Sequence, residues 1–414
     1  MTTRRVLVAL IAVLAIAILV GGLAVAGLAY WQFVARGPTT ADDLLVLDGA
    51  QRMHLVPPAG DSRLLAEDVS PELFRYPAFA PDGTRVAYIS QDREGIALHS
   101  LDLRTGARTE LYRSRENPPL YLAWSPDGRA IAFLSNRRTG GLGVHRVAAD
   151  GSSPSELIGI SPSSSYFAWQ PDSGALLLHI GGSSFEQGRV SVYGPGSSEP
   201  RVELVDPGFF QAPAWSRDGS QFFYVAQPPV SGPLSPDRVE SVLTRVAADG
   251  TAPLALASER TAAIIFLRSP ASDRLAYTTI SPAGPGALKL VDGAGGEVRT
   301  LSRPDEGVVA FFWSPDGARI AYLTTEPGGA LPRFTWHVAE LASGTISDLV
   351  SFAPSQAFAA LVNFFDAYAI SLDLWSPDGR QVVYGADDGV YVLDVVSGKA
   401  ERRAAGVLGM WPRR

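Results

Sequence analysis

The sequence predicts an all-β fold, a β-propeller of four-stranded blades, preceded by one transmembrane helix. Two observations lead to this prediction. A Trp-Ser-Pro-Asp-Gly motif returns along most of the chain at spacings of 45 to 62 residues, and an uncharged apolar stretch occupies residues 6–34. A period of roughly 40–50 residues with β-rich segments is typical of propeller blades rather than of helical repeats.

The N-terminal stretch has the length and composition of a membrane-spanning helix, because residues 6–34 are almost wholly Leu, Ile, Val, Ala and Gly. Arg4 and Arg5 precede it and only Arg36 follows closely, so the positive-inside rule predicts a cytoplasmic N-terminus and an extracytoplasmic remainder. A cleaved signal peptide is the alternative, since residues 24–26 (Ala-Val-Ala) resemble a cleavage site. The apolar run is long for a signal peptide, which favours an uncleaved signal anchor.

Composition limits the remaining function classes. The chain contains no cysteine, which excludes disulfides, a thiol nucleophile and cysteine-ligated metals. Residues 1–36 hold three arginines and no acid, so the remainder has 32 basic and 42 acidic side chains and a formal charge of −10. This negative charge disfavours nucleic acids and anionic membrane surfaces as partners.

Each copy of the repeat has the same order of segments. A short apolar run ends in an aromatic residue, a Pro-Asp-Gly turn follows, and a β-rich run comes next. In the turn, Pro presets φ, Asp can bond the backbone ahead, and Gly takes a positive φ. Two further strands follow in most units, which gives four strands per blade. The copies lie at residues 79–83, 124–128, 169–172, 215–219, 313–317 and 375–379, with a degenerate copy at residues 266–273 in which Phe266 is the predicted aromatic.

The two chain ends are predicted to complete one blade together. Residues 44–47, 52–56 and 63–66 resemble the second, third and fourth strands of a blade, and residues 406–411 end at an aromatic as a first strand does. Joining the ends would close the ring and hide its sheet edges. This gives eight blades, with seven as the alternative if the ends only extend an existing blade.

The domain organisation follows from these segments. We predict a cytoplasmic N-terminus and transmembrane anchor over residues 1–36, a short linker over residues 37–41, and the propeller over residues 42–414. The long spacing before the last motif copy leaves room for an insertion, and apolar residues recur at helical spacing over residues 354–369. We expect this helix to pack over one end of the ring or its rim.

The repeat resembles the TolB-like, WD40-like propeller repeats of bacterial envelope proteins, whose hallmark is a Trp-Ser-Pro-Asp-Gly turn followed by an Ile-Ala-Phe-like strand. Residues 124–128 and 131–133 show this pattern, and the resemblance covers about residues 41–412. It implies a location in the cell envelope and a binding role there. Together with the predicted N-terminal span, this gives a single-pass protein of the bacterial cell membrane with an extracytoplasmic propeller. A propeller is a platform onto which function is added, so the resemblance implies nothing sharper.

The repeated residues are interpreted as structural. A large ring at one repeating strand position fills the wedge between blades, which applies to Trp124, Trp169, Trp215, Trp313, Trp375 and Trp411. The turn aspartates and the Asp387-Asp388-Gly389 hairpin are interpreted as turn formers, since no D-x-D-x-D loop is present. The histidines are spread over separate blades, with His54, His99, His145 and His337 on third strands and His179 on a second strand. We therefore expect no metal site and no cofactor.

One candidate binding site remains, at a mouth of the central channel. Tyrosine precedes the repeated aromatic by three residues in three consecutive blades, as Tyr76, Tyr121 and Tyr166. Adjacent first strands would bring these rings together, where flat apolar faces with hydroxyls could hold a peptide or glycan. Packing between blades is the favoured alternative. Asp373, two residues before Trp375, is the acid expected to point inward.

These features predict a membrane-anchored, non-catalytic propeller that binds a protein, peptide or envelope glycan. An enzyme is not expected, because the sequence has no Gly-x-Ser-x-Gly elbow, no cysteine and no converging cluster of histidines or acids. The alternative is a hydrolase or ligand-sensing propeller with its site at the channel mouth. The single carboxylate of Asp373 is weak support for acid and base chemistry.

Overall fold

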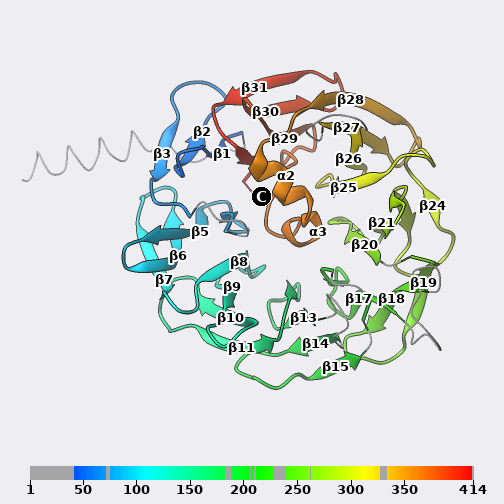
Figure 1. The fold of residues 1–414 in the computed structure, drawn as a ribbon, viewed down its shortest axis with the longest axis horizontal. Helices are drawn as coiled ribbons and strands as arrows, with labels where there is room; N and C mark the ends of the chain where they lie inside the picture. Colours follow the sequence, from blue (N-terminus) through cyan, green and yellow to red (C-terminus); the bar gives the residue numbers. More distant parts are fainter. Residues whose placement is uncertain are drawn as a thin grey trace, which may run out of the picture.

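The computed structural model describes residues 42–412, apart from residues 71–74, 182–187, 206, 209–210, 228–238, 262 and 327–332. These residues form eight small antiparallel sheets that stand around a central axis as the blades of a propeller (Figure 1). We number the blades along the chain and call the last one, which contains both chain ends, the closing blade.

The first four blades each have four strands in sequence order. Blade 1 consists of β4 (Ala78–Phe79), β5 (Arg85–Asp92), β6 (Gly95–Asp102) and β7 (Arg108–Ser114). Blade 2 consists of β8 (Pro119–Trp124), β9 (Ala130–Asn136), β10 (Leu142–Ala148) and β11 (Glu156–Ser161). Blade 3 consists of β12 (Ser165–Trp169), β13 (Leu176–Ile180), β14 (Arg189–Tyr193) and β15 (Val202–Val205). Blade 4 consists of β16 (Ala214–Trp215), β17 (Gln221–Ala226), β18 (Ser241–Ala247) and β19 (Leu254–Glu259).

The later blades vary this pattern. Blade 5 consists of β20 (Ala263–Arg268), β21 (Leu275–Ser281), β22 (Gly284–Pro285), β23 (Lys289–Val291) and β24 (Arg299–Thr300). Blade 6 consists of β25 (Val308–Trp313), β26 (Arg319–Glu326), β27 (Arg333–Glu340) and β28 (Ile346–Phe352). Two helices follow, α2 (Gln356–Val362) and α3 (Phe365–Tyr368). Blade 7 consists of β29 (Gln381–Ala386), β30 (Gly389–Asp394) and β31 (Ala400–Ala404), and a single bridge between Trp375 and Val382 stands for its first strand.

The closing blade confirms that both chain ends share one sheet. Its first strand is β32 (Leu408–Met410), and β1 (Leu44–Leu47), β2 (Met53–Val56) and β3 (Arg63–Ala66) complete it in the order β3-β2-β1-β32. β1 pairs with β32 in the register Leu45 to Met410, Val46 to Gly409 and Leu47 to Leu408. The blade count is therefore eight, and a C-terminal strand closes the ring.

The Pro-Asp-Gly turns are held by their own side chains. In blade 2, Ser125 Oγ donates to Asp127 Oδ1 at 2.6 Å, and the Arg129 amide donates to the same oxygen at 3.0 Å. Gly128 has a φ of 67°, which an L side chain adopts only at a cost. The same Ser to Asp bond recurs in blades 4, 6 and 7. These aspartates are thus committed to turns.

Five of the repeated tryptophans join neighbouring blades through their indole nitrogens. Trp124 Nε1 donates to the Ala78 carbonyl oxygen of the preceding blade at 3.0 Å. Equivalent bonds run from Trp169, Trp215, Trp313 and Trp375 to Ala123, Ala168, Leu267 and Phe312. In the opposite direction, the Arg85 guanidinium donates to the Gly128 carbonyl oxygen at 2.6 Å and lies 4.8 Å from the Trp124 ring.

One position of the predicted repeat was wrong, in blade 5. Trp313 bonds to the carbonyl of Leu267, and in the other blades this carbonyl directly precedes the repeated aromatic, so Arg268 and not Phe266 holds that position. The Ser269 amide bonds to Arg274 just as Ser125 bonds to Ala130, which confirms the alignment. Residues two apart share a face of a strand, so the apolar pattern alone could not separate Phe266 from Arg268.

The connections divide between two faces of the ring. Turns between first and second strands and between third and fourth strands lie on one face, which we call the turn face. Hairpins between second and third strands and the connections between blades lie on the other. We call this the plug face, because the connection between blades 6 and 7 contains the two helices that fill the channel mouth there. Asp42 lies at the turn face, because its carbonyl oxygen accepts from Arg403 and it lines one depression with Asp378 and Trp411.

The predicted membrane span, residues 6–34, lies outside the described residues. Among the residues that the structure does describe, no helix is both long and apolar enough to cross a membrane.

Candidate functional site

The predicted channel mouth is filled by two helices from the connection between blades 6 and 7. α2 and α3 lie over the centre of the ring (Figure 1). The sequence predicted one helix over residues 354–369, and the structure divides this interval at Asn363 and Phe364. Ser355 begins α2, where its side chain accepts a hydrogen bond from the Phe358 amide. We call residues 355–369 the plug.

The plug belongs to the core of the protein. Phe358, Leu361, Val362, Phe365 and Tyr368 are each at most 3% exposed. At about 1.5–3 kcal/mol for each large apolar side chain, their burial contributes at most roughly 8–15 kcal/mol, which is as much as the whole net stability of a domain. The plug is therefore not a lid that opens under ordinary conditions.

The three predicted tyrosines come together directly beneath the plug. Tyr76 Oη donates to the Ala357 carbonyl oxygen at 3.2 Å, and Tyr121 Oη donates to the Ala367 carbonyl oxygen at 2.9 Å. The rings of Tyr76 and Tyr121 lie 5.0 and 5.6 Å from the ring of Tyr368. The third ring, Tyr166, is 6.0 Å from Tyr121. All three predicted tyrosines are buried, so in this arrangement their rings and hydroxyls face the chain itself.

Asp373 lies at the seam between blade 7 and the closing blade. Its carbonyl oxygen accepts from the Trp411 amide at 2.8 Å, and its side chain is half-buried. The structure therefore brings the predicted tyrosines into one cluster and places Asp373 in the ring closure.

Asp366 is a buried acid of the plug that the sequence did not single out. Its Oδ2 accepts from the Ala212 amide at 2.9 Å, which ties α3 to the segment before β16. Burial raises the pKa of Asp366 above its ordinary value, although backbone amides oppose this shift. Burial and the nearby Asp366 carboxyl also raise the pKa of Tyr121 well above its ordinary value. An acid on a helical insertion has no sequence signal of its own, because only the docking of α3 buries it.

The substitution Asp366→Asn should stabilise the protein at neutral pH. A carboxyl whose folded pKa is raised contributes stability below its ordinary pKa and loses it as the pH rises through the folded value. The amide keeps an oxygen for the Ala212 amide and carries no charge. Thermal melts at pH 7.5 and pH 5 should show a higher melting temperature for the variant at pH 7.5 and a smaller difference at pH 5. Asp387→Asn, in an exposed hairpin, is the control, and an equal gain there would contradict the prediction.

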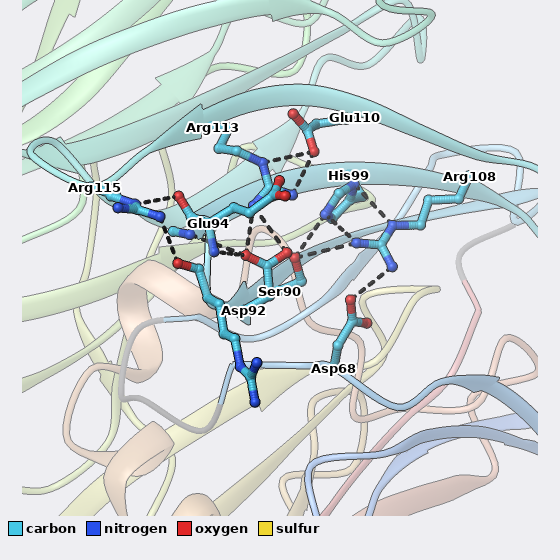
Figure 2. Close-up of polar contacts among 11 residues, drawn as sticks. Asp68, Ser90, Asp92, Glu94, His99, Arg108, Glu110, Arg113 and Arg115 are labelled. Carbon is cyan, nitrogen blue, oxygen red and sulfur yellow. Dashed lines mark hydrogen bonds and ion pairs between the residues drawn. The ribbon is translucent and has the colours of Figure 1, made fainter.

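Four of the histidines contact side chains of their own blades, as Figure 2 shows for blade 1, and His179 contacts the Gln211 carbonyl oxygen in the connection to blade 4. Ser90 Oγ lies 2.8 Å from His99 Nε2, Arg108 contacts the imidazole, and Arg108 NH1 donates to Asp68 Oδ2 at 2.8 Å. Burial, with the Arg108 charge adding to it, lowers the pKa of His99 to about 4. The imidazole is neutral at pH 7 and already bonded, which does not suit proton transfer.

The neighbouring arginines in Figure 2 are hydrogen-bonded to nearby carboxylates and backbone carbonyls. Arg113 donates to Asp92 and Glu110 at 2.7–3.0 Å, and Arg115 donates to the backbone carbonyls at the tip of the β5–β6 hairpin. These bonds clamp the hairpin to β7. The cluster thus rigidifies the plug face of blade 1.

Acid should destabilise the protein through its buried histidines. Burial lowers the pKa of His99, His145 and His179 to about 4 in each case. A group with a lowered folded pKa contributes stability above its unfolded pKa, about 6.5, and loses it as the pH falls toward the folded value. The melting temperature should therefore fall between pH 6.5 and pH 4, and His179→Gln should fall less steeply than the wild type. Parallel profiles for the two proteins would contradict this.

Blade 6 gathers a histidine and two carboxylates at the plug face. His337 lies on β27, Asp348 on β28 and Glu306 in the connection before β25, and their possible ligand atoms all lie within 4.8 Å of one another. His337 Nδ1 contacts Asp348 Oδ1 at 2.8 Å, and Nε2 contacts Thr324 Oγ1 at 2.9 Å. Within the described part of the chain, no other group of three such side chains is as close. Sequence reasoning missed it because Glu306 and Asp348 lie outside the repeat motif.

Comparison with known proteins addresses the fold. No protein-family model matches the sequence, and no curated protein matches it. A structure from a study of two prolyl endopeptidases is similar at 16% identity over 83% of this chain and 51% of that chain, with a TM-score of 0.54. The C-terminal WD40 domain of Sif2 is similar at 14% identity over 80% of this chain and 84% of its own, with a TM-score of 0.52. TolB from Acinetobacter baumannii matches at 15% identity over 79% of this chain and 82% of its own, with a TM-score of 0.41.

Similarity at this level of identity concerns the fold alone. The similar structures include one from prolyl endopeptidases and a WD40 domain, so the fold by itself does not decide whether this chain is an enzyme. The predicted propeller fold is confirmed, with eight blades closed by this chain's own C-terminal strand, and the WD40 domain of Sif2 is similar in fold.

Proposed function

We propose that this chain is a membrane-anchored, extracytoplasmic scaffold that binds a protein, peptide or envelope glycan on its plug face and catalyses no reaction. The observation that carries the proposal is the plug. A propeller channel offers a ligand site at its mouth only where side chains leave it open. Here the plug fills the mouth, and its backbone carbonyls accept the hydrogen bonds of the Tyr76 and Tyr121 hydroxyls. We therefore assign the partner to the outer surface of this face.

The position of Asp42 supports the choice of face. Asp42 enters the ring at the turn face, beside Asp378 and Trp411. An anchor over residues 1–36 joined by the short linker at residues 37–41 would hold the turn face toward the membrane. The plug face, with its hairpins and connections, would then be the surface that a partner can reach.

The test compares exposed positions on the two faces. The full chain is produced in bacterial membranes, carbonate washing establishes whether it is anchored, and chemical crosslinking from envelope preparations identifies partners. Asn363→Arg and Arg138→Glu alter the plug face, and Val396→Arg and Lys399→Glu alter the turn face; all four side chains are exposed. Loss of a specific crosslinked partner in the first pair but not in the second supports the proposal. Loss only in the second pair contradicts the choice of face.

Catalysis is the outcome that would overturn the non-catalytic part of the proposal. Wild-type protein and Asp373→Asn should both be inactive on a panel of peptide and polysaccharide substrates. Turnover by the wild type that disappears in Asp373→Asn, at an unchanged melting temperature, would show instead a hydrolase or lyase that uses this carboxylate.

A further inference from the structure

The polar cluster of blade 6 departs from a pattern shared with blade 5. In blade 5, Tyr277 Oη and Lys289 Nζ both donate to the carboxylate of Glu259, the last residue of β19 in blade 4, at 2.9 Å and 2.6 Å. Lys289 lies on the third strand directly opposite Tyr277, so the blade supplies its own cation to the acid. In blade 6, Glu306 accepts from Tyr322 Oη at 2.9 Å in the same way, yet the residue opposite Tyr322 is His337. No third-strand cation reaches Glu306.

Blade 6 also adds a second carboxylate to this place. Asp348 pairs with His337 across β27 and β28, just as Glu110 pairs with His99 in blade 1. In blade 1 the Glu110 carboxylate accepts a hydrogen bond from Arg113, whereas in blade 6 Asp348 Oδ1 lies 2.8 Å from His337 Nδ1. Two carboxylates and one imidazole therefore converge in blade 6.

Arg303 is the cation that now faces both acids. Its NH1 lies 2.6 Å from Glu306 Oε1 and 2.9 Å from Asp348 Oδ1. It comes from the connection between blades rather than from a strand, and its side chain is 44% exposed. A single guanidinium leaves one negative charge of the pair uncompensated. Because Arg303 is half in solvent on a long flexible side chain, it can leave the site without breaking the core.

The imidazole is oriented as in a metal site. The His337 ring stacks on Tyr322 with centroids 4.8 Å apart and 15° between the planes, and Thr324 Oγ1 holds Nε2 at 2.9 Å. Metal-ligating histidines use one ring nitrogen for the metal and donate the other N–H to a neighbouring acceptor. With Nε2 engaged by Thr324, Nδ1 is the nitrogen that faces Asp348 and Glu306.

We propose that Glu306, His337 and Asp348 bind a divalent transition-metal ion of the Zn²⁺ type, in competition with Arg303. One imidazole nitrogen and two carboxylate oxygens suit Zn²⁺ and its neighbours in the first transition series. On binding, the Nδ1 lone pair of His337 would face the metal, the Nε2 N–H would stay on Thr324 Oγ1, and Arg303 would move out. The ligand atoms now lie within 4.8 Å of one another, and metal bonds of about 2.0–2.2 Å require them to come closer together. The exposed Asp348 side chain can move closer by rotation. The metal would join the connection before β25 to the outer strand β28.

The test is a Zn²⁺ titration of the full chain, produced without a histidine tag and cleared of metal with a chelator. Isothermal titration gives the affinity and the stoichiometry, and the absorption of added Co²⁺ reports the ligand set. We expect one site in the wild type. Arg303→Gln should bind at least about ten-fold more tightly, because the competitor is gone, and Asp348→Asn should bind at least about ten-fold more weakly. Asp348 is exposed, so its variant should fold, which melting curves verify.

Glu110→Gln, at the equivalent position of blade 1, is the matched control and should leave the affinity unchanged. Any of three results would overturn the proposal: no saturable binding by the wild type at millimolar Zn²⁺, no gain in Arg303→Gln, or an unchanged affinity in Asp348→Asn. The site lies on the same face as the proposed partner surface, but its test measures only metal binding by the isolated protein, so its failure would leave the scaffold function standing.

Discussion

Removing residues 407–414 should produce a protein that does not fold cooperatively. The cut deletes β32, whose Leu408 and Met410, like the following Trp411, are each 1% exposed. Burial of three such side chains contributes roughly 5–9 kcal/mol, which is comparable to the net stability of a whole domain. The cut also leaves β1 as an unpaired edge inside the ring, and a free edge invites aggregation. Circular dichroism and size-exclusion chromatography of the truncated chain should show loss of the melting transition and aggregated material.

The control for this truncation moves the strand instead of removing it. Residues 407–412 are placed directly before Asp42, joined by a Pro-Asp-Gly turn like those of the other blades. Asp42 and Trp411 line one depression, so such a turn can span the distance. The relocated strand should restore a cooperative transition. A truncated chain that melts like the wild type would show that the β1–β32 pairing does not hold the ring closed.

Trp124→Ala should lower the free energy of unfolding by about 3–5 kcal/mol, as other large core truncations do. The ring is 7% exposed and fills the wedge between blades 1 and 2, where Arg85 lies over it. Its Nε1 bond to Ala78 also ties the two first strands together, and the substitution leaves that carbonyl without its donor. Urea unfolding monitored by circular dichroism measures the loss.

Trp124→Phe separates the two contributions of this side chain. Phenylalanine keeps most of the ring but cannot donate to Ala78, so the loss should be smaller, about 1–3 kcal/mol. Blade 1 itself has phenylalanine at this position, Phe79, which shows that the fold accepts it. A midpoint for Trp124→Ala equal to that of the wild type would exclude the packing role that its place in the repeat predicts.

Most of the architecture could be predicted because the same motif and the same order of strands recur along the chain. Each Trp-Ser-Pro-Asp-Gly copy contains the turn chemistry in its own residues, as the Ser125, Asp127 and Gly128 contacts show. The missing first strand beside residues 44–66 and the orphan strand at residues 406–411 each required a partner. Their union gave eight blades. In blade 5 the predicted repeat position was wrong by two residues, because alternation along a strand does not distinguish Phe266 from Arg268.

The candidate site was predictable only in part. Tyr76, Tyr121 and Tyr166 occupy equivalent positions in adjacent blades, and equivalence in a ring implies proximity, so their clustering followed from the repeat. Asp366 lies on the helical insertion, and Glu306 and Asp348 lie outside the repeat motif, although His337 occupies a third-strand position where other blades also have histidine. Such groups are formed by segments that are distant in sequence, and no local pattern marks them.

The sequence by itself indicated the strand order, the turns and the closure of the ring, and it favoured eight blades over seven, because each follows from a local motif and its recurrence along the chain. The structure decided what occupies the centre. The apolar face of residues 354–369 required burial, but periodicity says nothing about which surface will bury it. Only the closed ring, with Tyr76 and Tyr121 presenting hydroxyls to the Ala357 and Ala367 carbonyls, fixes the plug in the mouth. Tertiary packing therefore turned a predicted binding mouth into part of the core.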